Sequence, residues 1–495
     1  MLQLSQKTVT LWLLFGSPLA AAFSLPDAPP QLRLCRQGIA QSRLGHQRLW
    51  MSTLSPVPKE GNNHHEEQNR VVKISPSHFS KSRFMNVTAG TAVNDDEVSK
   101  PSYGPISMTL DELSVHLGGR GRARLAWDCY SLGIDPAYFY GKVIRLGLDV
   151  FETIHQALPS ARRTQKLGPA ALKQLASLYP NDAHQLEDGV ASLNHISQAK
   201  DTTTKLLLKL ADGSLVETVI IPWNGVRSTL CISSQVGCRQ ACRFCATGKM
   251  GLQRSLSSDE ILAQMFWAKK QVRQLQLPPI TNVVFMGMGE PADNSVAVTR
   301  AAEILTTREL FQLSATKVTI STVAPTPESF MEFAKAPAVL AWSVHAARDE
   351  VRRELVPTTR YSMDELCQGL IRALLQRPHN FRTTMLEYVM IANVNIDIET
   401  DGAALVELTQ KIQNSVPGCK LIVNLIPYNP IYESVKDIAP SSTLRPYEAP
   451  TPESVKDFQQ YLWSKNVYAH IRTTRGDDES AACGQLATQK SKKTP

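Results

Sequence analysis

Short apolar runs alternate with amphipathic stretches from about residue 229 onward. Six runs have the composition of buried strands, at 229–232, 282–286, 317–321, 339–344, 384–391 and 421–426. The stretches between them have helical periodicity, for example at 258–275, 296–306, 363–375 and 402–416. Strands that alternate with helices predict parallel βα units. Six units are too few for an eight-stranded barrel, so the pattern predicts an α/β fold built on a partial (β/α)6 barrel, open on one side.

A helical region and a small β extension are expected before this barrel. Helix signals run from about 107 to 200, and Thr109 is a candidate cap for the first helix. Strand-like runs at 205–209 and 216–221 follow. We therefore predict four folded segments: an N-terminal helical domain at 105–202, a β extension at 203–228, the barrel at 229–440 and a C-terminal extension at 441–495.

Residues 1–51 have the composition of a targeting segment. An apolar stretch at 8–22 ends in an Ala-x-Ala pattern that is typical of a signal peptide. The part that follows is rich in Arg and Ser, with Asp27 as its only acid, as in a transit peptide. With Phe23 at the junction, the two parts resemble the bipartite presequences of algae with secondary plastids, so we expect a plastid protein, with the mitochondrion as the alternative. The polar stretch at 52–104 is predicted to be a disordered linker.

Composition and charge add little to this picture. The chain has 495 residues, 43% of them hydrophobic and 20% charged, which is enough for a sizeable globular core. Residues 1–50 carry five basic residues and one acid, and so +4 of the net charge of +8. The remaining mild surplus permits a nucleic-acid partner without requiring one. Beyond the N-terminus no apolar run is long enough to span a bilayer, so no membrane partner is expected.

Three cysteines lie close together in Cys238-Arg-Gln-Ala-Cys242-Arg-Phe-Cys245. Three thiolates in one loop would hold three irons of a four-iron cluster and leave the fourth iron open. The small molecule expected there is S-adenosylmethionine (SAM). The alternative is a structural zinc site with Cys231 as fourth ligand, although zinc sites normally have paired C-x2-C motifs or Cys/His mixtures. Nine cysteines in a chain of this length do not suggest a disulfide scaffold.

Polar motifs follow the predicted strands at their carboxyl ends. They are Gly287-Met288-Gly289-Glu290-Pro291, Ser321-Thr322, Ser343-Val344-His345 and Tyr428-Asn429-Pro430. In βα barrels the chemistry collects at this end of the strands. We therefore expect these motifs and the cysteine loop to form one site.

From roughly Val216 to Leu486 the chain resembles the RlmN family, radical SAM methyltransferases that methylate carbon 2 of adenosine in large-subunit rRNA and in tRNA. The sister Cfr group methylates carbon 8. The motifs that carry the resemblance are Val216-Glu217-Thr218, Cys231-x3-Gln235-Val236-Gly237-Cys238, Phe285-Met286-Gly287-Met288-Gly289-Glu290-Pro291, Asn424-Leu425-Ile426-Pro427, and Arg475-Gly476-Asp477-Asp478 leading to Ala481-Ala482-Cys483-Gly484-Gln485-Leu486.

The resemblance implies a role for each matching residue. By this resemblance, the cluster ligands are Cys238, Cys242 and Cys245, which would hold one [4Fe-4S] cluster per chain. Its SAM contacts are Gly289, Glu290, Ser321, Ser343, His345 and Asn429. Its catalytic residues are Cys483 as the methyl-carrying thiol, Cys231 as its transient disulfide partner and Glu217 as proton acceptor.

The chemistry of the target explains why two thiols are needed. The sp2 carbon of adenine is electrophilic and does not attack the methyl group of SAM. Cys483 would instead take a methyl group from one SAM as a thiolate. A second SAM would give a 5′-deoxyadenosyl radical that removes hydrogen from methylated Cys483, and the carbon radical would add to the base. Cys231 would then release the product, so that two SAM are used per turnover.

The expected partners follow from this reaction. The adenine must leave its stack, so the substrate is large-subunit rRNA, with tRNA as a second candidate. Arginines at 120, 122 and 124, with Trp127 and Tyr130, would contact RNA from the helical domain, or would form a solvated basic turn. We also expect a one-electron donor such as ferredoxin or flavodoxin, and a monomer. Two alternatives stay open, namely carbon-8 methylation and a non-catalytic, zinc-stapled RNA-binding protein.

Overall fold

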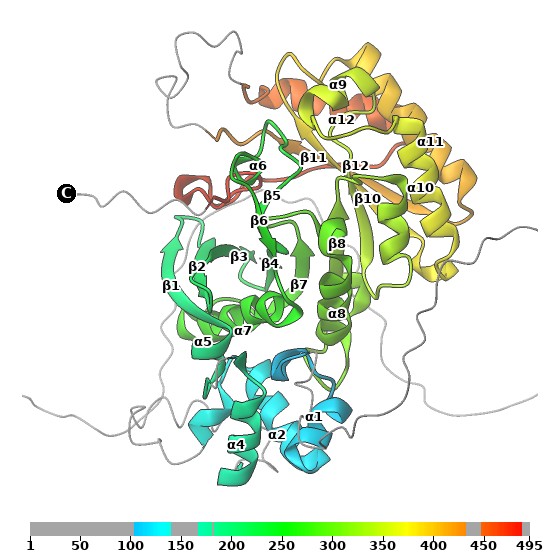
Figure 1. The fold of residues 1–495 in the computed structure, drawn as a ribbon. Helices are drawn as coiled ribbons and strands as arrows, with labels where there is room; N and C mark the ends of the chain where they lie inside the picture. Colours follow the sequence, from blue (N-terminus) through cyan, green and yellow to red (C-terminus); the bar gives the residue numbers. More distant parts are fainter. Residues whose placement is uncertain (1–102, 140–166, 181–182, 432–446, 488–495) are drawn as a thin grey trace, which may run out of the picture. The chain divides into compact units, whose positions relative to one another are not determined.

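The structure, a computed structural model, describes residues 103–139, 167–180, 183–431 and 447–487 (Figure 1). The targeting segment predicted at 1–51 and almost all of the linker predicted at 52–104 lie outside the described residues. Both therefore stay predictions.

Ten strands form one continuous sheet in the order β1-β2-β3-β4-β7-β8-β9-β10-β11-β12 (Figure 1). From β4 onward every neighbouring pair is parallel. These strands are β4 (Arg227–Cys231), β7 (Ile280–Phe285), β8 (Val318–Thr322), β9 (Val339–Ser343), β10 (Thr383–Met390), β11 (Lys420–Pro427) and β12 (Ala469–Ile471). The six predicted barrel strands and the partial barrel are confirmed. The short strand β12 was not predicted, because three residues are too few for a periodic pattern.

The helices between the strands also match the prediction. They are α7 (Ser258–Gln274), α8 (Ser295–Thr306), α10 (Met363–Leu375) and α11 (Ala403–Ser415), and the pattern missed α6 (Ala246–Lys249), α9 (Asp349–Leu355) and α12 (Pro452–Ser464). Reciprocal capping boxes begin α7 at Ser257 and α10 at Ser362. Shorter helical turns are η1 (Pro105–Ser107), η2 (Pro136–Phe139), η5 (Pro291–Asn294), η6 (Ala315–Lys317), η7 (Pro327–Phe333), η8 (His379–Phe381), η9 (Ile398–Gly402) and η11 (Asp477–Glu479).

The β extension continues the sheet of the barrel. Its strands β1 (Ala191–Gln198), β2 (Thr204–Leu210) and β3 (Leu215–Trp223) are antiparallel, and β3 pairs antiparallel with β4. The prediction that the helical region extends to about 200 is wrong, because residues 191–198 form the edge strand β1. This strand is largely exposed and polar, so its apolar alternation is weak.

The helical region consists of α1 (Leu110–Leu117), α2 (Arg120–Ser131), α4 (Pro169–Ser177) and the short α5 (Leu186–Gly189). The predicted Thr109 cap is confirmed, because its side chain accepts the backbone N–H of Glu112 at 3.2 Å. In the part of the chain that the structure describes, no helix is both long and apolar enough to cross a bilayer.

Two aromatic residues that were expected to face RNA are part of the core instead. Trp127 and Tyr130 have no exposed surface. The indole N–H of Trp127 donates to Met108 O at 3.1 Å, and the Tyr130 hydroxyl lies 2.6 Å from that of Tyr179. Buried rings cannot stack on bases, so this prediction is wrong. Helix packing outweighed the aromatic pattern.

The neighbouring arginines make contacts within the protein. Arg120 pairs with Asp111 and Glu309, and Arg124 pairs with Asp128. Arg122 donates to the carbonyl oxygen of Leu117 at 3.0 Å. The predicted turn is wrong, because all three arginines lie in α2. Their contacts favour the alternative in which these arginines do not bind RNA.

One prediction concerns the packing of α10 on η7. An added Cβ at Gly369 would lie 2.3 Å from the carbonyl oxygen of Pro327. We expect Gly369→Ala to lower the free energy of unfolding by about 1–3 kcal/mol, because backbone has to shift. In the matched control, Gly121→Ala in α2, the added Cβ meets nothing within 4 Å, so a gain of up to ~1 kcal/mol is expected. Chemical denaturation measures both, and equal stabilities would contradict the packing argument.

Candidate active site

The cysteine loop begins in a small β-hairpin. Strand β5 (Gln235–Cys238) pairs antiparallel with β6 (Gly251–Ser255), and Cys238 is the last residue of β5. Gly237 has a φ of +76°, and an added Cβ there would lie 1.8 Å from Gly251 O. Glycine is therefore required just before the first thiol. After the loop, Cys245 directly precedes α6.

The three thiols of this loop lie close enough to influence one another. Cys238 and Cys242 are buried and Cys245 is half-buried. Burial raises the pKa of Cys238 to about 12 and raises the pKa of Cys242 well above its usual range. The charge of Cys245 contributes to both shifts. Thiols that are buried in this way lose their protons readily only when a metal ion binds to the sulfur in place of the proton.

The donor set fits an iron–sulfur cluster better than a single ion. Zinc would need four ligands around one point, whereas each thiolate of a four-iron cluster binds a different iron. The thiol charge that contributes to the pKa of Cys231, the fourth ligand proposed for zinc, is that of Cys483 and not that of a cysteine of the loop.

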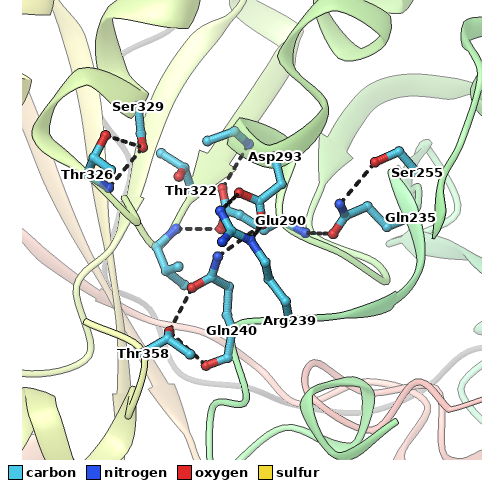
Figure 2. A network of polar contacts seen from close by, with 12 residues as sticks. Gln235, Arg239, Gln240, Ser255, Glu290, Asp293, Thr322, Thr326, Ser329 and Thr358 are labelled. Carbon is cyan, nitrogen blue, oxygen red and sulfur yellow. Dashed lines mark hydrogen bonds and ion pairs between the residues drawn. The ribbon is translucent and has the colours of Figure 1, made fainter. Parts of the chain in front are cut away.

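A polar network holds the loop in position (Figure 2). Asp293 accepts from Arg239 Nε at 2.6 Å and from Gln240 Nε2 at 3.1 Å. The hydroxyl of Thr358 donates to Gln240 Oε1 at 2.8 Å. Arg239 and Gln240 lie between the first and second thiols, so the loop is fastened to the segments after β7 and α9.

The C-terminal segment is fastened to the same loop. Ala246 N, directly after the third thiol, donates to Gly484 O at 2.7 Å, and Thr247 Oγ1 donates to Leu486 O at 2.6 Å. Asn429 Nδ2, just beyond β11, donates to Cys483 O at 3.1 Å. These bonds bring Cys483 beside the cysteine loop.

Cys483 lines a pocket that is open to solvent and is formed at the carboxyl ends of the barrel strands. The lining residues are Ile221, Trp223, Met286, Glu387, Ile426, Asn429, Arg472, Thr473, Thr474, Arg475, Ala481, Ala482 and Cys483. A mainly apolar pocket with a few convergent polar groups is the usual form of a ligand site.

The pocket thiol and Cys231 interact with each other. Cys483 is exposed toward the pocket, but the protein around it raises the pKa of its thiol to about 11, while the charge of Arg472 opposes the shift. Cys231, the last residue of β4, has its pKa raised to about 12 by burial and next by the charge of Cys483. The structure thus brings together the two thiols to which the resemblance gives a shared step.

Comparisons with known proteins agree with this arrangement. Residues 232–400 match the Radical SAM superfamily. A radical SAM methyltransferase from Sphaerobacter thermophilus has a similar structure, with 31% identity, a TM-score of 0.59, and 78% of this chain and 99% of that one covered. The "Dual-specificity RNA methyltransferase RlmN" of Oleidesulfovibrio alaskensis is 39% identical over 303 residues, which cover 60% of this chain and 79% of the relative.

The chain belongs to the RlmN/Cfr family. The protein of the same name from Alcanivorax borkumensis is 38% identical over 301 residues, covering 60% of this chain and 74% of the relative. Membership of this radical SAM family implies a [4Fe-4S] cluster and SAM.

Several residues that RlmN similarity assigns to SAM lie around the cysteine loop. Gly289 has a φ of +105°, and an added Cβ there would lie 2.6 Å from the Gln235 side chain. Glu290 is buried, and burial raises the pKa of its carboxyl to about 7. Its Oε1 accepts Ala292 N and its Oε2 accepts Val323 N, each at 2.9 Å (Figure 2). Backbone therefore fixes this carboxyl in place.

The remaining SAM candidates lie at the ends of β8, β9 and β11. The hydroxyls of Ser321 and Ser343 are 2.9 Å apart, which aligns the ends of β8 and β9. His345 is buried, its ring stacks edge-on to Phe244 of the cysteine loop at 4.7 Å, and its Nδ1 accepts Val389 N. Burial lowers the pKa of His345 to about 3, so the ring is neutral. The contact with Phe244 ties the ring to the cysteine loop.

Glu217 lies apart from these residues. It is buried on β3, its Oε1 is 3.4 Å from Lys205 Nζ, and it accepts the backbone N–H of Ala487. Burial raises the pKa of its carboxyl, and Lys205 opposes the shift. Glu217 is covered by the C-terminal segment and does not line the pocket. Ile221 and Trp223, which lie on the same face of β3, do line the pocket.

Sequence reasoning missed Glu387 and its partners. This carboxyl lies on β10 and lines the pocket; its Oε1 accepts Asn424 Nδ2 at 2.8 Å and its Oε2 lies 4.0 Å from Arg472 Nη1. Burial raises the pKa of Glu387, and Arg472 opposes the shift. The signal in the sequence was an acid inside an otherwise apolar strand, which is costly unless the site uses it.

A prediction follows for the anchor of the cysteine loop. We expect Asp293→Asn to weaken cluster retention by roughly tenfold, because residues that orient metal ligands typically contribute that much. The rate of iron loss to a chelator, followed by cluster absorbance, measures the effect. Asp364→Asn, which removes a surface ion pair with Lys411, is the control and is expected to leave the rate unchanged. Equal rates in both variants would show that the anchor is dispensable.

Proposed function

We propose that this protein is an RNA methyltransferase that methylates carbon 2 of an adenosine in large-subunit rRNA, with tRNA as a second substrate. The observation that supports the proposal is that Cys483 lines a pocket beside the cysteine loop and that its charge acts on the thiol of Cys231. Both curated relatives are named as dual-specificity RNA methyltransferases. A binding protein with a zinc staple would have no use for a second, separate thiol pair.

The cofactors have candidate binding residues in this chain. Cys238, Cys242 and Cys245 would hold the cluster, and the SAM contacts would come from Gly289, Glu290, Ser321, Ser343, His345 and Asn429. When bound, the cluster supplies one electron that cleaves SAM to a 5′-deoxyadenosyl radical. We expect the electron to come from a small donor protein such as ferredoxin or flavodoxin.

Cys483 accepts the methyl group in this proposal. Its Sγ must first lose a proton, and the surrounding protein opposes this step because it raises the pKa of the thiol to about 11. Arg472 is the cation that lowers this cost. The new S–CH3 bond then forms at Sγ as the sulfonium–CH3 bond of the donor breaks.

Cys231 frees the enzyme from the product. Once the bridging carbon has added to carbon 2, the adduct would have to lose the hydrogen of carbon 2 as a proton, for which the resemblance assigns Glu217 as acceptor, and to return one electron to the cluster. The Cys231 thiolate then attacks Cys483 Sγ, and a disulfide forms as the bond between Cys483 Sγ and the bridging carbon breaks. The electron pair of the broken bond goes to that carbon, which takes a proton and becomes the methyl group of the base. A reductant must open the disulfide before the next turnover, as for other thiol–disulfide cycles.

The pocket would admit the target base. An adenine turned out of its stack would meet the apolar side chains of Ile221 and Trp223 and the polar groups of Glu387 and Arg472. Such a mixture of stacking surface and hydrogen-bonding groups is typical of sites that hold a flipped base.

The two thiols give distinct predicted phenotypes. Cys483→Ala is expected to abolish methylation and to leave the iron content unchanged, because it removes the methyl carrier alone. Cys231→Ala is expected to accumulate protein covalently joined to RNA, because release is blocked. Denaturing gels of reactions with labelled RNA measure both. Cys419→Ala, at a half-buried cysteine before β11, is the control and should methylate normally.

The identity of the product tests the proposed function itself. Reconstituted protein, SAM, reductant and large-subunit rRNA should give 2-methyladenosine, identified by retention time and mass against both isomers. A carbon-8 product would assign the chain to the Cfr activity instead. A colourless protein with stoichiometric zinc and no methylated nucleoside would support the binding protein.

A further inference from the structure

Arg352 is a buried cation beside the cysteine loop. It lies on α9 with 1% of its surface exposed. Its Nη1 donates to Ser343 O at 3.1 Å and also to Val344 O, and its Nη2 donates to Val323 O. These carbonyls lie at or beyond the ends of β8 and β9, so the guanidinium joins the two strand ends that carry SAM candidates.

This charge has no salt-bridge partner within the described residues, where every hydrogen bond of Arg352 goes to a backbone carbonyl. Burying an unpaired charge is costly, and burial lowers the pKa of Arg352 to about 10, so it remains protonated at neutral pH.

Two of the three negative groups that act on this cation belong to the candidate site, and the third is Asp349 of α9 itself. The charges of Cys242 and Glu290 are the two largest influences that favour protonated Arg352. The loop is also docked directly on α9, because Arg243 N donates to Leu355 O at 3.0 Å. Cys242 and Val351 belong to one apolar cluster that seals the contact.

We propose that Arg352 is a positioning residue that supplies the buried counter-charge for the thiolate-ligated cluster and so makes its reduction easier. The proposal rests on the cluster of the proposed function. Reduction adds one electron, taken from a one-electron reductant, and therefore one negative charge. A fixed cation favours the more negative form, and the potential of such clusters depends on nearby charge.

The chain contains a matched control. Arg377 is also buried, and it donates to five carbonyls, those of Phe333, Ala334, Ala336, Ala338 and Phe381. Burial lowers its pKa to about 10, as for Arg352, but no thiol or carboxyl charge contributes. Its carbonyls precede β9 and β10, whereas those of Arg352 lie at or beyond the carboxyl ends of β8 and β9, so Arg377 caps the opposite end of the barrel.

The test is a reductive titration of the reconstituted cluster with dithionite and mediators, followed by absorbance and electron paramagnetic resonance. Arg352→Gln keeps a donor but loses the charge. It is expected to reduce the equilibrium constant for cluster reduction by roughly tenfold, a shift of about 59 mV to a more negative potential. Arg352→Lys keeps the charge and should stay close to the unmodified protein. Arg377→Gln should leave the potential unchanged.

Each outcome decides the proposal. Equal potentials in Arg352→Gln and the unmodified protein would overturn it, as would equal shifts in Arg352→Gln and Arg352→Lys, which would point to a structural role alone. If Arg352→Gln fails to fold or to hold iron, Arg352→Lys decides, since a shifted potential in that variant refutes the counter-charge. The measurement needs no RNA, so a chain that reduces its cluster as expected but yields no 2-methyladenosine would refute only the proposed function.

Discussion

Two hydrogen bonds between distant parts of the sequence hold the candidate site together. Ala246 N donates to Gly484 O, and Thr247 Oγ1 donates to Leu486 O, which lies 239 positions further along the chain. Because Cys245 and Cys483 directly precede the first bonded pair, these contacts fix the late thiol against the cysteine loop. The parallel sheet cannot do this alone, since β12 ends at Ile471 and the chain beyond it has no strand partner among the described residues.

The β extension adds a second support to the same segment. Gly476 N donates to Asp201 Oδ2 at 3.3 Å, and Lys200 N donates to Asp478 Oδ2 at 3.1 Å. Lys205 Nζ, on β2, donates to Ser480 O at 3.2 Å. The turn between β1 and β2 therefore holds the residues just before Cys483 in place by hydrogen bonds. An extension that contributes nothing to closing the barrel thus has a role in positioning the chemistry.

The barrel and the cysteine loop were predictable from the sequence because they depend on local signals. Apolar runs, capping boxes and a close cysteine spacing each act within a few residues. The missed features depend on tertiary context. Trp127 is part of the core because other helices and Phe311 enclose it; the centroids of the Trp127 and Phe311 rings are 5.6 Å apart. The importance of Glu387 depends on Arg472, which meets it only after β12 has joined the sheet.

The candidate site has two halves, the cysteine loop and the pocket around Cys483, and Cys245 influences the thiols of both. Desolvation raises the pKa of the thiols in both halves. In each half one arginine opposes the shift, Arg352 for Cys242 and Arg472 for Cys483. The charge of Cys245 raises the pKa of both thiols. Cys245, the third thiol of the cysteine loop, therefore couples the two halves, because its charge acts on the loop thiol Cys242 and on the pocket thiol Cys483 alike.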